Sequence, residues 1–461
     1  MDSLLLASAA EVSAGTTVLF GALLVGLILC LAFEEKLHAQ KSVIAGAFAF
    51  GGLLLAEVFH LYPERAVVQF GEHALELPLY VPPINWEVIA IILGSSLFVD
   101  ITSKSGLFTW IAIRLTKASG GDPRKLLWAY GVMTVVFSAV LNNVTAMIIV
   151  GSLTAVSLEK LGRNDKLLGF LMIEGLLTNI GGLLTLISSV PNILVGSAAG
   201  ISFVAFFLKS APYVLVTTVV TIWMGAKLFR IAGLGTEQER AEARVLVAGF
   251  DERDGIESPA FFWFGAVMML AFIGVIASTS VLPYIRDLGM GYVALSFAGI
   301  MLLRYKAVAD RFYQALDWDL LGFFCALFLF IHVIEQAQVL HVIGLGMEQL
   351  IGLGPQGGPA AVLWGAAVFS SVTDNIPLAA MLANILQDLD TPSDSPLWWS
   401  VVFGANLGGN LTPIGSASTL VAVTIMHKHE LKVTFGGFVK LAYVYALIQL
   451  VLATVYVLAT A

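Results

Sequence analysis

Residues 405–421 read ANLGGNLTPIGSASTLV, and residues 178–194 read TNIGGLLTLISSVPNIL. When Asn179 is set on Asn406, seven residue pairs are identical, so one phrase occurs twice with an offset of 227. Glycine pairs let the backbone approach a neighbour closely, and Pro191 and Pro413 each remove a helical N–H group. Each phrase therefore predicts a helix that is broken within an apolar stretch.

The composition is typical of a polytopic membrane protein. Of the 461 residues, 58% are hydrophobic and only 12% are charged, whereas soluble globular proteins carry about 25% charged residues. A helix needs roughly 20 apolar residues to cross a bilayer. We therefore expect an all-α polytopic membrane protein with about ten transmembrane helices. The apolar stretches lie near residues 17–33, 43–61, 86–101, 166–200, 205–229, 259–280, 288–303, 318–334, 397–426 and 434–460.

The basic residues are concentrated in a few loops. Lys and Arg occur at 36–41, 114–125, 158–166, 227–244, 304–311 and 428–432, whereas residues 312–427 contain none. Because basic loops face the cytoplasm, this pattern predicts an integral protein of the bacterial inner (cytoplasmic) membrane with both termini outside. Trp398 and Trp399 are predicted to be interfacial anchors.

Two segments are expected to enter and leave the membrane on the same side. Residues 126–157 have basic loops on both flanks and a polar break at Asn142-Asn143, which predicts a re-entrant hairpin entering from the cytoplasm. Residues 360–388 have no basic flank and predict a hairpin entering from outside. The two segments are copies with an offset of 232, and they share the pairs Val136/Val368, Phe137/Phe369, Ser138/Ser370, Val140/Val372 and Asn143/Asn375.

The duplications predict two inverted repeats. The offset of 232 places Trp86 on Trp318, and five predicted spans separate them, an odd number that turns the second copy upside down. Inverted repeats with broken helices are typical of secondary transporters. The expected organisation is a polar N-terminal tail (1–16), a first repeat (17–230) with the hairpin near 126–157, a cytoplasmic linker (231–258), and a second repeat (259–461) with the hairpin near 360–388.

Polar side chains at the hairpin tips and in the broken helices form the candidate site. Backbone groups freed at half-helix ends, together with side-chain oxygens, are suited to binding ions. The alternative is that small and hydroxylated residues only let the helices pack. The predicted substrate- or ion-binding residues are Asn142, Asn143, Thr185, Ser188, Ser189, Asn192, Asp374, Asn375, Asn410, Thr412, Ser416, Ser418 and Thr419. A sodium ion is expected at Asn143, Ser189, Asp374, Asn375 and Ser416.

Four acidic residues are candidates for proton coupling. Asp374 stands where the first hairpin tip has the amide of Asn142. A carboxylate at this depth is costly to bury, so we predict that Asp374 has a function. A proton and a cation would compete for it, which is the chemistry of exchange. Glu174 lies one helical turn before Thr178 and is either a relay on that helix face or a residue that reaches the headgroups. Asp100 and Glu335 are either proton-path groups or helix-end groups.

The chain resembles the ArsB/NhaD branch of the ion transporter superfamily, which includes NhaD-type sodium/proton antiporters, arsenite permeases and P-protein-like permeases. The resemblance extends over nearly the whole chain and rests on NNVTAM, EGLLTNIGGLLTLISSVPNILV, TDNIPLAAM and GANLGGNLTPIGSASTLV. It implies a two-repeat scaffold, a substrate site between hairpin tips and broken helices, and a homodimer. Asn142 and Ser188-Ser189 stand where P-protein-like members carry acidic residues. The TPIGSASTL stretch leans towards arsenite permeases.

These features predict a secondary active transporter that works by alternating access, most simply a sodium (or lithium)/proton antiporter. The alternative is an ion- or proton-coupled carrier of a small solute or anion such as arsenite, silicate or a carboxylate. An ion channel fits inverted repeats less well. We expect no enzyme, because no nucleophile–base pair, metal-ligand spacing or nucleotide loop stands out. The expected partners are the bilayer and a small ion or solute, with no nucleic acid and no cofactor; sodium and protons are the transported or coupling ions.

Overall fold

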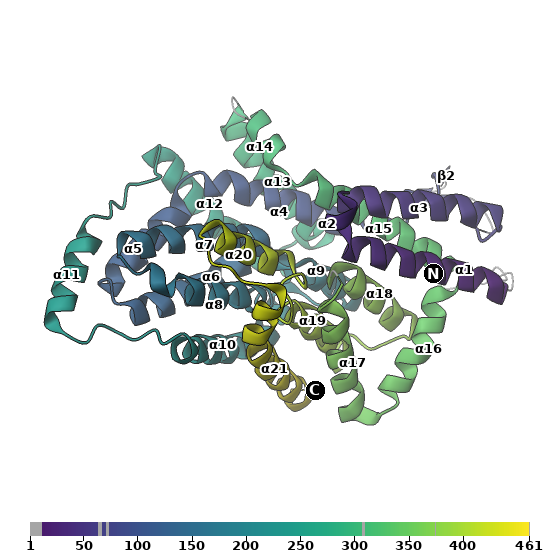
Figure 1. Cartoon of the computed structure of the whole chain (residues 1–461). Helices are drawn as coiled ribbons and strands as arrows, with labels where there is room; N and C mark the ends of the chain where they lie inside the picture. The colour runs from purple at the N-terminus through teal and green to yellow at the C-terminus, as the bar shows by residue number, and fades with distance from the viewer. Residues whose placement is uncertain (1–11, 63–66, 71–72, 307–308, 374, 461) are drawn as a thin grey trace.

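The computed structural model describes residues 12–62, 67–70, 73–306, 309–373 and 375–460, and most of these residues are helical (Figure 1). A short antiparallel hairpin, β1 (Val67–Phe70) and β2 (His73–Glu76), pairs Val67 with Glu76. The first half contains α1 (Ala14–Ala32), α2 (Glu34–Leu37), α3 (Lys41–Val58), α4 (Trp86–Ser103), α5 (Leu107–Ser119), α6 (Pro123–Val140), α7 (Asn143–Lys160), η1 (Asn164–Lys166), α8 (Leu167–Gly181), η2 (Leu186–Ser188), α9 (Val190–Ala199) and α10 (Phe203–Leu228).

The second half follows after a connecting helix, α11 (Glu237–Ala248). It contains α12 (Pro259–Ser278), α13 (Ile285–Arg304), α14 (Ala309–Ala315), α15 (Trp318–Gln336), α16 (Val339–Ile351), α17 (Gly354–Ser370), α18 (Asn375–Asp388), α19 (Pro396–Gly408), α20 (Ala417–Lys428) and α21 (Phe435–Ala459).

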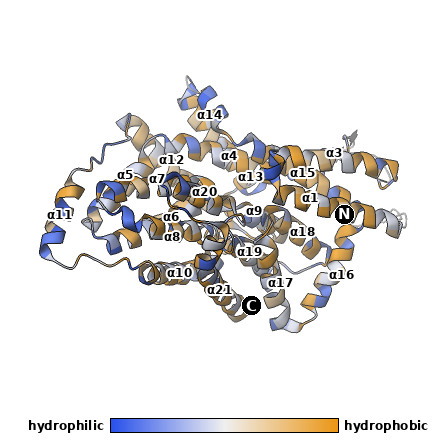
Figure 2. Ribbon diagram, viewed as in Figure 1, coloured by the Kyte–Doolittle hydropathy of each residue, from blue (hydrophilic) through white to orange (hydrophobic). Residues whose placement is uncertain are grey.

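Eight helices in the described part of the chain are long and apolar enough to cross a membrane: α1, α3, α4, α10, α12, α13, α15 and α21. The broken helices α8–α9 and α19–α20, counted as one span each, bring the total to the ten predicted. Large apolar side chains such as Val18, Leu54 and Leu270 are exposed on the outer helices, and hydrophilic residues gather on α11 and α14 (Figure 2). Apart from the short β1–β2 hairpin, the protein is therefore a helical polytopic membrane protein, as predicted.

The helices of the second half repeat the order of the first. The series α4, α5, α6–α7, α8–α9 and α10 recurs as α15, α16, α17–α18, α19–α20 and α21. The capping chemistry recurs as well. Asn85 Oδ1 accepts a hydrogen bond from the Val88 N–H at the start of α4 (3.2 Å), and Asp317 Oδ1 accepts one from Leu320 at the start of α15 (2.9 Å). The opposite orientation of the two halves in the membrane stays a prediction.

Each half contributes one helix that packs against the other half. The helix α3 packs along α15 and α13 packs along α4, while α7 contacts α20 and α18 contacts α9. Two equivalent carboxylates support this packing: Glu87 Oε1 accepts from the Gly291 N–H of α13, and Asp319 Oδ1 accepts from the Ser42 N–H of α3, each at 2.9 Å. Each carboxylate thus satisfies an N–H group near the start of a helix in the other half.

The core of the molecule is formed by the first arms of the broken helices. Every residue of α8 from Gly169 to Gly181 is buried, and so is every residue of α19 from Leu397 to Gly408. The prediction that Trp398 and Trp399 are interfacial anchors is wrong, because both rings lie in this core and the Trp398 indole N–H donates to the Pro392 carbonyl (2.8 Å). The polar atom of this indole finds its partner inside the protein.

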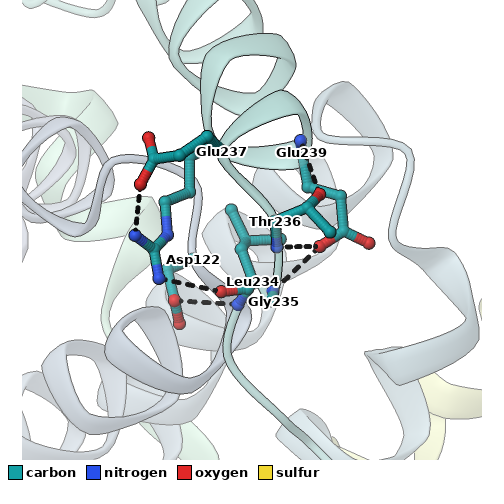
Figure 3. Close-up of polar contacts among 7 residues, drawn as sticks. Asp122, Leu234, Gly235, Thr236, Glu237 and Glu239 are labelled. Carbon is teal, nitrogen blue, oxygen red and sulfur yellow. Dashed lines mark hydrogen bonds and ion pairs between the residues drawn. The ribbon is translucent and has the colours of Figure 1, made fainter.

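The connection between the halves is docked onto the first half. We call residues 231–258 the strap. Asp122 accepts hydrogen bonds through Oδ1 from the N–H groups of Arg124 (2.9 Å) and Lys125 (3.0 Å), and through Oδ2 from Leu234 of the strap (3.0 Å), as Figure 3 shows for Leu234. One carboxylate therefore caps α6 and holds the strap at the same time.

The remainder of the strap is fixed by further contacts. A capping box starts α11, in which Thr236 and Glu239 bond each other's backbone N–H groups (Figure 3). Glu252 pairs with Arg114 and Lys117 of α5 at 3.3 Å each, and the Lys160 ammonium lies 5.0 Å from the centre of the Phe250 ring. The strap thus lies across the ends of α5, α6 and α7.

Candidate functional site

Both copies of the duplicated phrase are helix breaks. In the first, α8 ends at Gly181, a short turn η2 follows, and α9 starts at Val190. In the second, α19 ends at Gly408 and α20 starts at Ala417. The intervening backbone is irregular although most of its residues are buried, and such backbone at membrane depth requires protein or water as its partner. The prediction of two broken helices is therefore confirmed.

The glycines in these phrases allow close packing against the hairpins. A Cβ atom added at Gly181 would lie 2.7 Å from the Val135 carbonyl oxygen of α6, and one added at Gly408 would lie 2.4 Å from the Ala367 carbonyl oxygen of α17. Both distances are shorter than atoms tolerate. Glycine at these two positions is thus what lets each broken helix touch the first arm of its own hairpin.

Four equivalent hydroxyl groups attach the hairpin ends to the broken helices. Ser138 Oγ lies 2.6 Å from the Thr178 carbonyl oxygen, and Ser370 Oγ lies 2.5 Å from the Ala405 carbonyl oxygen. Thr185 and Thr412 donate in the opposite direction, to the carbonyl groups of Ala139 and Ser371 at the ends of α6 and α17. Thr185 and Thr412, predicted as ligands, therefore hold the hairpin tips in place.

Two asparagines connect the halves where the broken helices cross. Asn179 Nδ2 donates to Ser416 Oγ (3.0 Å) and Thr419 Oγ1 (3.2 Å) of the second half. In the equivalent contact, Ser189 Oγ donates to Asn406 Oδ1 (2.8 Å), and Asn406 Nδ2 donates to Asn192 Oδ1 (2.9 Å). We call these two sets of contacts the amide crossings. Their members pair at the offset of 227: Asn179 with Asn406, Ser189 with Ser416, and Asn192 with Thr419.

Sequence reasoning missed Asn179 and Asn406 as site residues. Both were identical in the duplicated phrase, but a match between copies does not reveal that each residue reaches into the other copy. Both amides are buried and fully engaged. Of the residues predicted from the two copies separately, Ser189 and Asn192 lie together in one crossing, and Ser416 and Thr419 lie together in the other.

The crossing at Ser416 is the richer in oxygen atoms. Ser416 Oγ lies 2.7 Å from Thr419 Oγ1 and 3.1 Å from Ser418 Oγ. Ser418 Oγ donates to Asn179 Oδ1 (3.1 Å), and Asn410 Oδ1 accepts from Asn179 Nδ2 (2.9 Å). Asn410 also donates to Gln449 Oε1 of α21 (2.8 Å), a side chain that sequence reasoning did not select. Hydroxyl and amide oxygens are the hard ligands that alkali cations prefer.

The remaining predicted ligands satisfy the broken backbone or the hairpin tips. Ser188 Oγ and Asn192 Nδ2 both donate to the Gly182 carbonyl, at 2.6 Å each. The Asn143 amide lies over Gly182, where an added Cβ would approach it to 2.7 Å. Asn142 Oδ1 caps α7 by accepting from Thr145 N–H (2.8 Å), and Asn375 is the first residue of α18. Asp374 lies outside the described residues.

Glu174 is buried on α8, five residues before Asn179. Its side chain is 0% exposed, Oε1 accepts a 2.6 Å hydrogen bond from Thr154 Oγ1 of α7, and Oε2 has no hydrogen-bond partner in the described part of the chain. The interpretation of Glu174 as a residue that reaches the headgroups is therefore wrong. A buried carboxylate without a cationic partner costs several kcal/mol.

Asp100 and Glu335 are paired away from the crossings. Asp100 Oδ2 lies 2.9 Å from Lys104 Nζ near the end of α4, and Glu335 Oε2 lies 3.5 Å from His332 Nδ1 near the end of α15. Both pairs are partly exposed, as helix-end groups are. Within the described residues, His, Cys, Asp and Glu do not form a group of three that could hold a metal ion.

Both the sequence and the fold of this chain have counterparts among known proteins. Residues 28–404 match the model of the CitMHS family, whose description is citrate transporter. The chain belongs to this family. The protein is therefore a membrane transporter, and the predicted resemblance to the ion transporter superfamily is confirmed.

Individual relatives agree with this assignment. The 46 kDa membrane protein of Mycobacterium leprae is 29% identical over 382 residues, which cover 81% of this chain and 86% of the relative. The P protein of Homo sapiens is 23% identical over 500 residues, covering 89% of this chain and 58% of the P protein. The crystal structure of the Alcanivorax borkumensis YdaH transporter has the same fold, with a TM-score of 0.60 at 14% identity over 91% of this chain and 98% of YdaH.

Proposed function

We propose that this transporter exchanges sodium ions for protons by alternating access, with the cation bound at the crossing around Ser416 and the proton carried by Asp374 and Glu174. The observation that carries the proposal is the chemistry of the amide crossings. The described side chains of the crossings, and of their neighbours Asn410, Ser418 and Gln449, are Asn, Ser, Thr and Gln, which offer neutral oxygen atoms. Lys, Arg and His are absent from this described set. Such a centre suits a small cation better than a bare multivalent anion.

Two acidic groups supply the proton in this proposal. Asp374 precedes Asn375, the first residue of α18, in the sequence, and Glu174 lies buried against Thr154. A carboxylate that loses its proton when a cation arrives keeps the site close to neutral, whereas a buried charge without compensation is costly. Exchange of one ion for the other then follows from competition for the same charge.

A carboxylate carrier is the second candidate, and the description of the family as citrate transporters favours it. In that case the N-terminal ends of α9 and α20 would face the carboxylate groups, because helix N-termini attract anions. A citrate carrier would also need cations or protons to balance the charge of citrate. Sodium and protons would then move with the substrate and not against each other.

Purified protein in liposomes with a trapped pH dye separates the two candidates. If the protein is an antiporter, a sodium pulse outside should alkalinise the lumen without citrate, because sodium enters while protons leave. Potassium should serve as the negative control. A response only when citrate is present would favour the carboxylate carrier and overturn the antiport proposal.

Asp374→Asn tests the acidic group directly. We expect sodium-driven proton movement to fall by at least about tenfold, because the amide cannot exchange a proton for a cation. Asp390→Asn is the matched control, since it makes the same chemical change in the loop after α18, and it should leave exchange unchanged. Parental exchange in the Asp374→Asn protein would contradict the role given to this carboxylate.

A further inference from the structure

A file of buried hydroxyl groups leads towards Glu174 from the base of the first hairpin. Thr116 Oγ1 of α5 lies 2.7 Å from the Tyr130 hydroxyl of α6, which lies 2.8 Å from Ser157 Oγ of α7. Ser157 is one helical turn from Thr154, so the two side chains share a face of α7. Thr154 donates to Glu174 (2.6 Å). We call Thr116, Tyr130, Ser157 and Thr154 the hydroxyl file.

The outer end of the file lies at the turn between α5 and α6. Ser119, three residues after Thr116, donates to the Thr116 carbonyl (2.7 Å) and accepts from the Gly121 N–H (3.1 Å). Lys117 and Lys125 lie at the same end of the molecule as this turn. By the charge rule for loops, this end faces the cytoplasm. The file therefore points from the cytoplasmic end to the buried acid.

The hydroxyl file exists in one half only. At the equivalent positions of the second half, the chain has Val362 for Tyr130, Leu389 for Ser157, Leu386 for Thr154 and Val401 for Glu174. The hairpin and crossing contacts, in contrast, occur in both halves. Burying a hydroxyl group is unfavourable unless it is hydrogen-bonded, and an apolar side chain fills the same space without this cost. The retention of four polar groups along one path therefore points to a role beyond packing.

The charged groups around Glu174 do not neutralise it. Its neighbour α6 contributes Tyr130, and α7 has Lys160 about 9 Å along the axis from Thr154. The helix α20 approaches α8 at Ala422, which packs against Gly175, and its basic residues His427 and Lys428 come later in the helix. On α10, the Lys227 ammonium lies over the Trp223 ring. From α21, Tyr445 approaches Gly225 of α10. A change of charge at Glu174 therefore requires a proton or a cation to arrive or leave.

We infer that Glu174 takes up and releases its proton through the hydroxyl file, from the cytoplasmic end alone, an inference that rests on the proposed proton coupling at Glu174. On uptake, an O–H bond of a hydronium ion at the α5–α6 turn breaks and an O–H bond forms at the Glu174 carboxylate. Each hydroxyl group in between gives up one proton and receives another, so its own proton count is unchanged. Ser157 and Thr154 are not hydrogen-bonded to each other, and a water molecule would carry the proton across this one step. Hydroxyl hydrogens rotate, which lets the same chain carry protons in both directions.

Matched variants in the file test this route. Thr154→Val and Tyr130→Phe remove one hydroxyl each with little change of shape, whereas Thr154→Ser keeps the hydroxyl. Thr134→Val is the control, because Thr134 is a buried hydroxyl of α6 that donates to the Tyr130 carbonyl (2.7 Å) and lies outside the file. Thermal unfolding in detergent would confirm that all four variants fold.

Two measurements in liposomes separate the proton route from substrate transport. Radioactive sodium counterflow at equal pH on both sides needs no net proton movement, and pH-dye recordings report proton flux. We expect Thr154→Val and Tyr130→Phe to keep counterflow within about twofold and to slow proton flux by about tenfold or more. Thr154→Ser and Thr134→Val should behave as the parent. Parental proton flux in both Thr154→Val and Tyr130→Phe would overturn the route.

The failure of the proposed function would have a different signature. If the parent protein shows no sodium counterflow but moves protons with citrate, the antiport proposal fails and the same variants are tested with citrate-driven proton flux. The route then stands if Thr154→Val and Tyr130→Phe slow that flux and Thr134→Val does not. If the parent moves no protons with either substrate, both the route and the proton coupling are wrong.

Discussion

At the scale of single residues, Asn179 and Asn406 join the two halves of the protein. Each amide is buried and contacts side chains from the opposite broken helix. A buried amide both donates and accepts, so it can bind two hydroxyl or amide partners at once. Loss of one such amide would leave several buried partners without a hydrogen bond, which is more costly than loss of an exposed contact.

Asn179→Ala is expected to lower the free energy of unfolding by about 1–3 kcal/mol and to abolish sodium binding at the Ser416 crossing. The stability change would be measured by thermal unfolding in detergent and the binding by sodium-dependent shifts of the unfolding midpoint. Asn85→Ala is the control, since it removes a capping amide of the same kind at the start of α4 and costs about 1 kcal/mol. Sodium should still stabilise the Asn85→Ala protein; sodium stabilisation of Asn179→Ala to the same degree would contradict the role of the crossing.

At the scale of elements, each broken helix packs so tightly against its hairpin that the two behave as one unit. Gly408 meets the Ala367 carbonyl of α17, and Ser370 and Thr412 fasten the hairpin end to the same helix. The first half has the same contacts at Gly181, Ser138 and Thr185. Displacement of a hairpin tip therefore displaces the adjoining break in the helix.

Gly408→Ala is expected to lower stability by roughly 1–3 kcal/mol, because its Cβ atom would lie 2.4 Å from backbone that must shift. Gly365→Ala is the matched control in α17, where an added Cβ meets nothing within 4 Å, and it should raise stability by roughly 0.5–1 kcal/mol. Thermal unfolding of the two variants measures both changes. Equal stability of the two alanine variants would show that the close approach is not required.

The start of α11 should loosen in acid. The N–H groups of Thr236 and Gly235 bond the Glu239 carboxylate and hold the pKa of Glu239 below its usual 4.5. Because the folded form has the lower pKa, this stabilisation is present above pH 4.5 and is lost as the pH falls through the folded value. Hydrogen-exchange protection of these two amides should drop below pH 4.5. In Glu239→Gln that drop should be absent; its persistence would assign the effect to another group.

At the scale of the whole molecule, two copies of one plan perform different tasks. Some contacts occur in equivalent form in both halves: α3 packs on α15 as α13 packs on α4, and there are two amide crossings. The hydroxyl file and Glu174 belong to the first half, whereas the larger oxygen cluster lies around Ser416 in the second. A duplicated scaffold thus keeps the contacts that join its copies and changes the residues that act on ions.

Much of this plan could be predicted from the sequence. The duplicated phrases revealed both broken helices, because glycine pairs, prolines and hydroxyl groups are rare together in apolar stretches. Partners across the halves could not be predicted, since identity between Asn179 and Asn406 says nothing about which side chains they touch. Trp398 was misassigned because an aromatic residue at a helix start looks the same whether it faces lipid or protein. Tyr130 was overlooked because a single tyrosine in an apolar helix carries no pattern.

The docking of the strap has a consequence for how the chain can be divided. Asp122, Arg114 and Lys117 hold residues 234–252 against the first half, so the strap belongs to that half although it precedes the second. Two separately expressed polypeptides cut at Glu257–Ser258 should therefore reassemble in the membrane into a working transporter. A cut at Gly233–Leu234 would leave the strap on the wrong fragment. Co-purification of tagged fragments and flux in liposomes would measure this, and equal recovery from both cuts would argue against it.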